Sequence, residues 1–124
     1  MNTRIFLACV LAVLNHSAFA QAVGAANGTI PFFRIFTDGQ GGQLRLNMPG
    51  EPPGTCNYYG ANVKFEFSTA NGKAMLAAIM TAKSTGTPVT VWYQYSSAPG
   101  SGTGAGCTVD TMAILQGISV GQAQ

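Results

Sequence analysis

The chain has 124 residues, of which 8% are charged, and its formal net charge is +2 at pH 7. This length suits one small domain. The lysines and arginines are scattered, whereas a nucleic-acid partner requires clustered cations that neutralise phosphates, so the composition predicts no binding to nucleic acid.

The N-terminus carries the three parts of a secretory signal peptide. Residues 1–4 contain one positive charge, residues 5–14 are apolar, and Ala18-x-Ala20 is a small-x-small cleavage pattern. We therefore expect a signal peptide at 1–20, a mature domain at 21–124, and a secreted or periplasmic protein. A transmembrane anchor needs about 20 apolar residues, so this run is too short for one, and no later stretch is apolar enough.

Cleavage after Ala20 would remove Cys9 and the single histidine, His16, and leave Cys56 and Cys107. An even pair of cysteines in an exported protein is most simply a disulfide. It would close a loop of about 50 residues, which the chain-entropy model values at roughly 4 kcal/mol. The alternatives are two free thiols or a metal pair. Two isolated cysteines without histidine make a poor metal site, so we expect no metal and no cofactor.

The first half of the mature chain predicts three strands. Residues 22–28 are rich in glycine and alanine and are expected to form a loose arm. Residues 29–37 are typical of a strand, and a turn at 38–42 would close a hairpin with residues 43–48, which alternate in polarity. A proline-rich loop at 49–55 follows, and residues 62–67 alternate again.

The second half predicts a helix and two strands. At residues 71–84 the apolar period changes to that of one helical stripe. That stripe is formed by Met75, Leu76, Ile79 and Met80. Residues 89–95 are strong β-formers, residues 96–106 form a Gly/Ser-rich loop, and residues 109–120 form the last strand, in which Gly117 indicates a bulge or bend.

The order strand, strand, strand, helix, strand, strand is that of the OB-fold, a partly open five-stranded barrel. We therefore expect a mostly β domain of the α+β class, in which the helical stripe plugs one end of an OB-fold-like barrel. An open α+β sheet with the helix on one face is the alternative that the pattern leaves open.

The stretch GKAMLAAIMTAKSTGTPVTV at 72–91 resembles the helix-to-strand passage in the B subunit of subtilase-type AB5 cytotoxins. It is also similar to a broad group of small secreted bacterial proteins. In both, a hairpin like 29–48 comes first, a cysteine precedes the third strand as Cys56 does, and the final strand follows a cysteine-bearing loop. The resemblance implies an OB-fold and, for the toxin relatives, a ring of subunits that binds cell-surface glycans. It carries over no sugar-contacting residue.

The mature chain lacks the residues of common catalytic systems. Without histidine it has no Ser-His-Asp or Cys-His system, and paired cysteines leave no thiolate. Nothing in the sequence places two carboxylates together as a glycosidase requires. The four carboxylates are those of Asp38, Glu51, Glu66 and Asp110. We therefore expect no enzyme.

Aromatic residues are the positive signal for binding. Trp92 alternates with Tyr93 on the predicted strand 89–95, and Tyr58 and Tyr59 follow Cys56. Aromatic rings beside hydrogen-bonding groups suit contacts with sugars and proteins, although such rings can also simply fill a small core. The guanidinium groups are candidate partners for an acidic sugar, because their geometry matches a carboxylate. These are the groups of Arg34 and Arg45.

Two phenylalanines are candidate interface residues. If Phe33 and Ile35 face the core, Phe32 and Phe36 point outward, and exposed rings on a strand mark an interface, here one that would permit a homo-oligomer.

Taken together, the sequence predicts a secreted binding module for a host glycan or surface receptor. An exported structural or interaction protein that binds another bacterial protein is the alternative.

Overall fold

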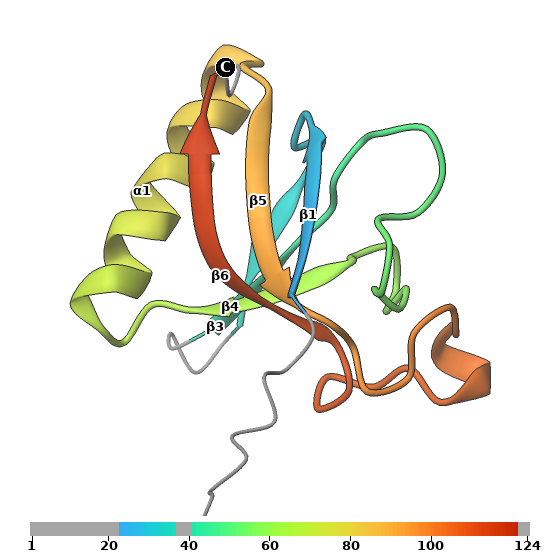
Figure 1. The fold of residues 1–124 in the computed structure, drawn as a ribbon. Helices are drawn as coiled ribbons and strands as arrows, with labels where there is room; N and C mark the ends of the chain where they lie inside the picture. Colours follow the sequence, from blue (N-terminus) through green and yellow to red (C-terminus); the bar gives the residue numbers. More distant parts are fainter. Residues whose placement is uncertain (1–22, 37–40, 122–124) are drawn as a thin grey trace, which may run out of the picture.

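The computed structural model describes residues 23–36 and 41–121. The expected signal peptide, with Cys9 and His16, lies outside these residues. The described chain forms one six-stranded sheet with a single α-helix against it (Figure 1). None of its helices is long and apolar enough to cross a membrane.

The first strand of the sheet is the segment expected to be a loose arm. That prediction was wrong, because β1 (Val23–Gly28) pairs antiparallel with β5 (Val89–Gln94). Its small residues allow close packing: a Cβ on Gly24 would lie 2.5 Å from Cε1 of Tyr95. Glycine and alanine have low intrinsic strand preference. We therefore attribute the formation of this strand to its packing, which for Gly24 is against the rings of Tyr93 and Tyr95.

The predicted hairpin is present but shorter than expected. It consists of β2 (Phe33–Ile35) and β3 (Gly41–Leu44), which pair antiparallel with Phe33 opposite Leu44. Its connection at 37–40 lies outside the described residues. Pro31 separates β1 from β2, because a proline has no N–H to donate to a continuous ladder. The sheet therefore has six strands where five were predicted.

The remaining strands follow the prediction closely. They are β4 (Val63–Glu66) and β6 (Ala113–Val120), the second preceded by a short 3₁₀ helix η1 (Thr103–Ala105). The strand order is β1-β5-β6-β4-β3-β2, and β4 and β6 are the parallel pair. The β5–β6 register shifts between Trp92 and Tyr93, opposite Gln116 and Gly117, which confirms the bulge expected at Gly117.

The helix α1 (Ala70–Thr85) begins and ends with well-formed caps. The side chain of Thr69 accepts a hydrogen bond from the Gly72 amide, and Gly86 ends the helix in the left-handed region. Ile79 is buried, as predicted, but Met80 is 53% exposed. Its placement in the core stripe was wrong, because one residue further along a helix turns the side chain about 100° away from the sheet.

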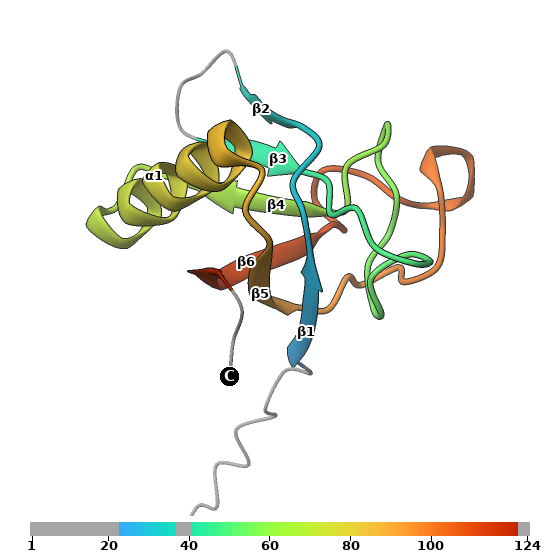
Figure 2. The same cartoon turned by 90° about the horizontal axis from the view of Figure 1, so that it is seen from above.

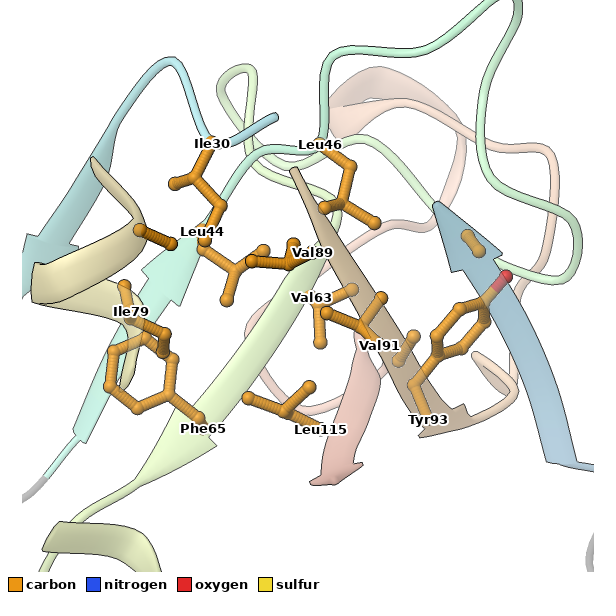
Figure 3. Close-up of a cluster of buried hydrophobic side chains, with 13 residues drawn as sticks. Ile30, Leu44, Leu46, Val63, Phe65, Ile79, Val89, Val91, Tyr93 and Leu115 are labelled. Carbon is orange, nitrogen blue, oxygen red and sulfur yellow. The ribbon is translucent and has the colours of Figure 1, made fainter. Parts of the chain in front are cut away.

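The buried apolar side chains form two clusters. The main core lies inside the bend of the sheet, with Ile79 of α1 at one end and Tyr93 at the other (Figure 3). Its largest fully buried members are Leu44, Leu46, Val63, Phe65, Ile79, Val89, Val91 and Tyr93. A smaller group, called here the disulfide cluster, consists of Cys56, Ala61, Cys107 and Met112. The predicted disulfide is confirmed: Cys56 is bonded to Cys107, and their Cα atoms are 5.7 Å apart.

The described sheet is not closed into a barrel. Its two edges, β1 and β2, are consecutive in the chain and lie at opposite ends of the strand order. One isolated bridge joins the segment between them to the residues after β3, where the Asn47 amide donates to the Thr29 carbonyl at 2.8 Å. Figure 2 shows the bend of the sheet that brings these parts together.

Candidate functional site

A tight turn at residues 58–61, called here the tyrosine turn, presents the two predicted tyrosines. The amide of Tyr58 donates to the Ala61 carbonyl at 2.9 Å, and the Ala61 amide donates back at 3.0 Å. The φ angles are +45° at Tyr59 and +87° at Gly60. Two positive φ angles in a two-residue connection are the signature of a type I′ turn. Tyr59 is thus held in a conformation that tyrosine rarely adopts.

The strained backbone of Tyr59 is fixed from both sides. Nη2 of Arg34 donates to the carbonyl oxygen of Tyr59 at 2.7 Å and to that of Tyr58 at 3.3 Å. The Gly60 amide donates to Oδ1 of Asn57 at 2.8 Å. These bonds give partners to backbone groups that the turn itself does not pair, and they offset the energetic cost of the left-handed φ angle of Tyr59.

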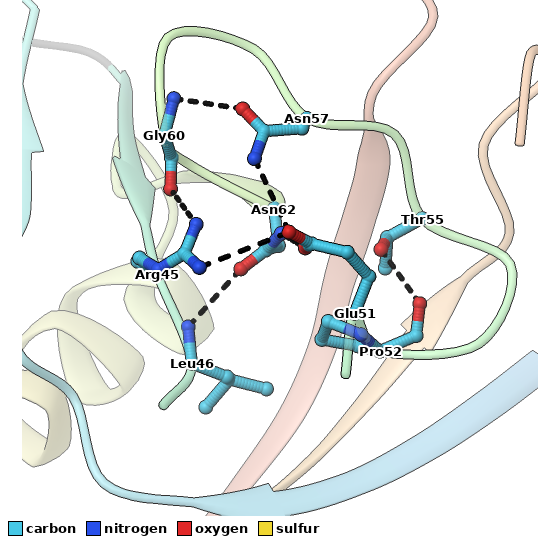
Figure 4. A network of polar contacts seen from close by, with 8 residues as sticks. All are labelled: Arg45, Leu46, Glu51, Pro52, Thr55, Asn57, Gly60 and Asn62. Carbon is cyan, nitrogen blue, oxygen red and sulfur yellow. Dashed lines mark hydrogen bonds and ion pairs between the residues drawn. The ribbon is translucent and has the colours of Figure 1, made fainter. Parts of the chain in front are cut away.

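A second set of polar contacts ties the turn to the preceding proline-rich loop (Figure 4). Nη1 of Arg45 donates to the Gly60 carbonyl at 2.9 Å, and its Nη2 lies 3.7 Å from Oε1 of Glu51. The same carboxylate accepts hydrogen bonds from the side-chain amides of Asn57 and Asn62. Glu51 therefore offsets the charge of Arg45 and links three segments.

The two rings of the tyrosine turn have different surroundings. Tyr58 is half-buried against the disulfide cluster, whereas Tyr59 is 70% exposed. The rings meet edge to face, with centroids 4.8 Å apart. One anchored ring thus supports one projecting ring, an arrangement that limits the loss of side-chain entropy when the exposed ring binds a ligand.

Four of the five predicted binding residues therefore come together at the tyrosine turn, and Trp92 does not. Trp92 lies on β5, separated from β2 by β6, β4 and β3. Arg34 and Arg45 donate to carbonyl groups of the turn itself, so the geometry makes them positioning residues. Their role towards an acidic sugar stays a prediction.

The indole of Trp92 lies on the sheet face away from the main core, as alternation predicts. Trp92 is 40% exposed and pairs with Ala25 on one side and Gly117 on the other. A Cβ on Gly117 would lie 3.5 Å from Cε3 of the indole, so the ring rests against the glycine. Val23 and Ile114 are also exposed, and both pair with Gln94, two residues along β5 from Trp92, so the three apolar side chains surround Gln94 on one face of the sheet.

The predicted interface phenylalanines have separate positions. Phe32 is half-buried and packs against the disulfide cluster, with Cζ 3.5 Å from the place of a Cβ on Gly60. The condition for their outward placement holds for Phe33, which packs against the main core, but not for Ile35, which is 44% exposed at the last position of a three-residue edge strand. Phe36 is half-buried at the rim of a pocket. An interface at these residues stays a prediction.

That pocket, called here the Phe36 pocket, has a volume of about 270 Å³ and brings together residues that sequence reasoning treated separately. Its lining includes Phe36, Gly41, Lys64, Glu66, Val109 and Asp110. Nζ of Lys64 donates to the Val109 carbonyl at 2.8 Å. The alternation of Lys64 and Glu66 indicated one outward face of β4, but no local signal placed Asp110 beside it.

The described residues, 23–36 and 41–121, contain no group of three or more side chains suited to hold a metal ion.

Tyr93 is a core residue: its hydroxyl donates to the Pro53 carbonyl at 2.6 Å. Burial, and to a smaller extent the neighbouring Tyr95, raises the pKa of the Tyr93 phenol above its usual value. A neutral donor in the core is therefore favoured at this position.

Comparisons with known proteins find nothing similar: no family model matches the chain, and neither a curated protein nor a solved structure matches it. The site is therefore interpreted from its geometry alone.

Proposed function

We propose that the chain is an exported, non-enzymatic binding module that recognises a host glycan or surface receptor in the manner of a toxin B subunit. One observation carries the proposal: Tyr59 is 70% exposed, while its backbone is held at a φ of +45°. Strained residues that the surrounding structure fixes are concentrated at functional sites. The export signal at 1–20, the mature domain at 21–124 and the secreted or periplasmic location belong to this proposal.

An OB-type barrel belongs to the same proposal. If residues 23–35 act as one long first strand, the order β2-β3-β4-β6-β5-β1 becomes a ring that begins and ends on that strand. The parallel pair β4–β6 and the Thr29–Asn47 bridge support this interpretation. Barrels of this type bind oligosaccharides through the face of their second and third strands and through neighbouring loops. In the proposed ring these strands are β3 and β4, and the tyrosine turn lies in the connection between them.

The chemistry of the turn favours a ligand with an apolar face and hydroxyl groups. The exposed ring of Tyr59 provides stacking area, and its hydroxyl provides a polar edge. The nearby guanidinium groups donate to the turn, and Glu51 lies beside that of Arg45. A sugar that stacks on the Tyr59 ring would therefore use the exposed group of this surface, because the guanidinium groups are already engaged.

A glycan array with the purified mature domain tests the proposal. Three proteins are compared: wild type, Tyr59→Asn and Trp92→Ala. Asparagine is a preferred residue at this turn position, so Tyr59→Asn removes the ring and retains the turn. We expect it to lose about 2 kcal/mol of binding free energy, or roughly thirtyfold in affinity, as a hot-spot aromatic does. The Trp92→Ala variant is expected to bind normally. A wild-type protein that binds no glycan on the array and no cell surface would contradict the proposal.

A second candidate, an interaction protein with a bacterial partner, is favoured by the exposed apolar side chains of Val23, Trp92 and Ile114 around Gln94. Exposed apolar side chains grouped on a sheet face mark protein contacts, including contacts between copies in a homo-oligomer. A sedimentation mass above that of one mature chain, lost in Trp92→Ala, would support it. A monomeric wild type would remove the homo-oligomer.

A further inference from the structure

We propose that the Phe36 pocket is a second binding site, which takes one neutral pyranose unit of a glycan. This inference rests on the proposed function and names the ligand class. The pocket shares no lining residue with the tyrosine turn. The two positions can therefore be tested separately.

One wall of the pocket is an aromatic ring placed on bare backbone. The amide of Phe36 donates to the Gly41 carbonyl at 2.7 Å, which continues the hairpin pairing beyond β2. A Cβ on Gly41 would lie 2.9 Å from Cδ2 of the phenylalanine, so glycine allows the ring to lie against the strand. The ring is half-buried and packs against the strand at Gly41. A phenyl face suits contact with the C–H face of a pyranose.

The rest of the pocket lining carries both acceptors and a donor. Lys64 and Glu66 are two residues apart on β4 and therefore point to the same face. Lys64 uses one of its three donors on the Val109 carbonyl, at 2.8 Å, which fixes the ammonium group and leaves two donors. Asp110, next to Val109, brings a second carboxylate from the loop before β6.

The carboxylates of the pocket are available to a ligand. Glu66 and Asp110 are both exposed, and the ion pair found within residues 23–36 and 41–121 joins Arg45 to Glu51 instead. Their oxygens can accept hydrogen bonds from hydroxyl groups, and charged acceptors form the stronger bonds.

The charges of the pocket select against an anionic ligand, because the lining holds two carboxylates and one ammonium group. A ligand carboxylate or phosphate would face the carboxylates of Glu66 and Asp110, while the Lys64 ammonium already donates to the Val109 carbonyl. Like charges placed opposite each other in an interface are unfavourable. A neutral polyol can donate to both carboxylates and accept from the ammonium group. The volume of about 270 Å³ is below the usual range for drug-sized ligands and suits one ring.

Titration of the mature protein by two-dimensional ¹H–¹⁵N NMR tests this site. The probes are the methyl glycosides of galactose, glucose and mannose, with N-acetylneuraminic acid as the anionic sugar. We expect at least one neutral glycoside to shift the backbone amides of Phe36, Lys64, Glu66 and Asp110 at millimolar concentration. The anionic sugar is expected to shift them less.

Matched variants locate the effect. Glu66→Ala removes an exposed carboxylate and should weaken the neutral glycoside roughly tenfold, as the loss of a hydrogen bond to a charged group does. Lys83→Ala on the exposed side of α1 should leave the affinity unchanged. Unchanged affinity in Glu66→Ala, stronger shifts with the anionic sugar, or no shift in the pocket would overturn the proposal.

The two sites fail in different ways. Shifts confined to the tyrosine turn would overturn the Phe36 pocket and leave the proposed function standing. Shifts at the pocket that persist in Tyr59→Asn would support the pocket and move glycan recognition away from the turn. No shift at either place, together with an empty array, would contradict both proposals.

Discussion

Nη2 of Arg34 donates a hydrogen bond of 2.7 Å to the carbonyl oxygen of Tyr59, across 25 positions of sequence. Arg34 is the middle residue of β2, and Tyr59 is the residue with the left-handed φ angle in the tyrosine turn. An edge strand of the sheet thus determines the backbone geometry of a loop far along the chain. The position of the exposed ring depends on this link.

Replacing Arg34 by alanine should therefore loosen the turn. The variant loses the bonds to the Tyr58 and Tyr59 carbonyls and its stacking on Phe32, whose ring centroid lies 5.5 Å from Cζ. We expect the free energy of unfolding to fall by about 1 to 3 kcal/mol, the usual effect of removing a charged hydrogen-bond donor. Urea unfolding measures it, with Lys73→Ala on α1 as the exposed control, expected within about 0.5 kcal/mol of wild type. Equal stability of Arg34→Ala and wild type would mean that the bonds contribute nothing.

Tyr59→Asn should act in the opposite direction on stability. A left-handed backbone costs most residues about 1 to 2 kcal/mol, whereas asparagine adopts it readily. Since the Tyr59 ring is largely exposed, little packing is lost. We expect the free energy of unfolding to rise by about 1 kcal/mol, while binding weakens. Thermal and urea unfolding check the first part, and Tyr58→Asn, which removes a half-buried ring, is the contrasting variant that should be destabilised. A loss of stability in Tyr59→Asn would show that the ring supports the fold.

Gly72→Ala should destabilise the junction between α1 and β4. Alanine normally favours a helix over glycine, but here a Cβ would lie 2.0 Å from the Glu66 carbonyl oxygen. Overpacking against backbone typically costs about 1 to 3 kcal/mol, which exceeds the gain in helix propensity. Asn71→Ala, at the exposed neighbouring position, is the control and should be neutral or slightly stabilising. Urea unfolding that places Gly72→Ala above wild type would contradict the close approach of helix and strand.

Local signals in the sequence were sufficient for the helix, for β4 and for the disulfide. A period of 3.6 residues ending in Gly86 predicts α1, and the two cysteines that follow the expected signal peptide predict one bond. The strand β1 could not be predicted in this way, because its small residues are suited to close contacts made elsewhere in the fold: Gly24 lies against the rings of Tyr93 and Tyr95, and Gly28 lies against the backbone of Asn47. Propensity describes a residue alone, and this strand depends on its partners.

The candidate site was partly predictable for a similar reason. The sequence indicated Tyr58 and Tyr59 as contacts, but the direction of the guanidinium groups depends on carbonyl groups far away in the sequence. The Phe36 pocket depends on the meeting of Phe36 after β2, Gly41 of β3, β4 and the loop before β6, where Lys64 donates to a carbonyl 45 positions away. Nothing in the local pattern of these segments indicates such a meeting.

The phenol of Tyr93 should make stability dependent on pH in the alkaline range. Burial raises its pKa above the usual 10.0, with a smaller contribution from Tyr95, so the folded protein holds this proton more tightly than the unfolded chain. The stabilising contribution is fully present below pH 10.0 and is lost as the pH rises through the higher pKa of the folded protein. We therefore expect the free energy of unfolding of the wild type to decline above that pH.

Tyr93→Phe separates this effect from general alkaline denaturation. The variant loses the hydroxyl that donates to the Pro53 carbonyl at 2.6 Å, so at neutral pH it should be about 1 to 2 kcal/mol less stable. Above pH 10.0 its stability should decline less steeply than that of the wild type, because the titrating group is gone. Tyr59→Phe is the matched control: it removes a hydroxyl from an exposed ring and should retain the full wild-type slope. Urea unfolding across the alkaline range measures all three proteins, and parallel slopes for wild type and Tyr93→Phe would assign the alkaline loss to other groups.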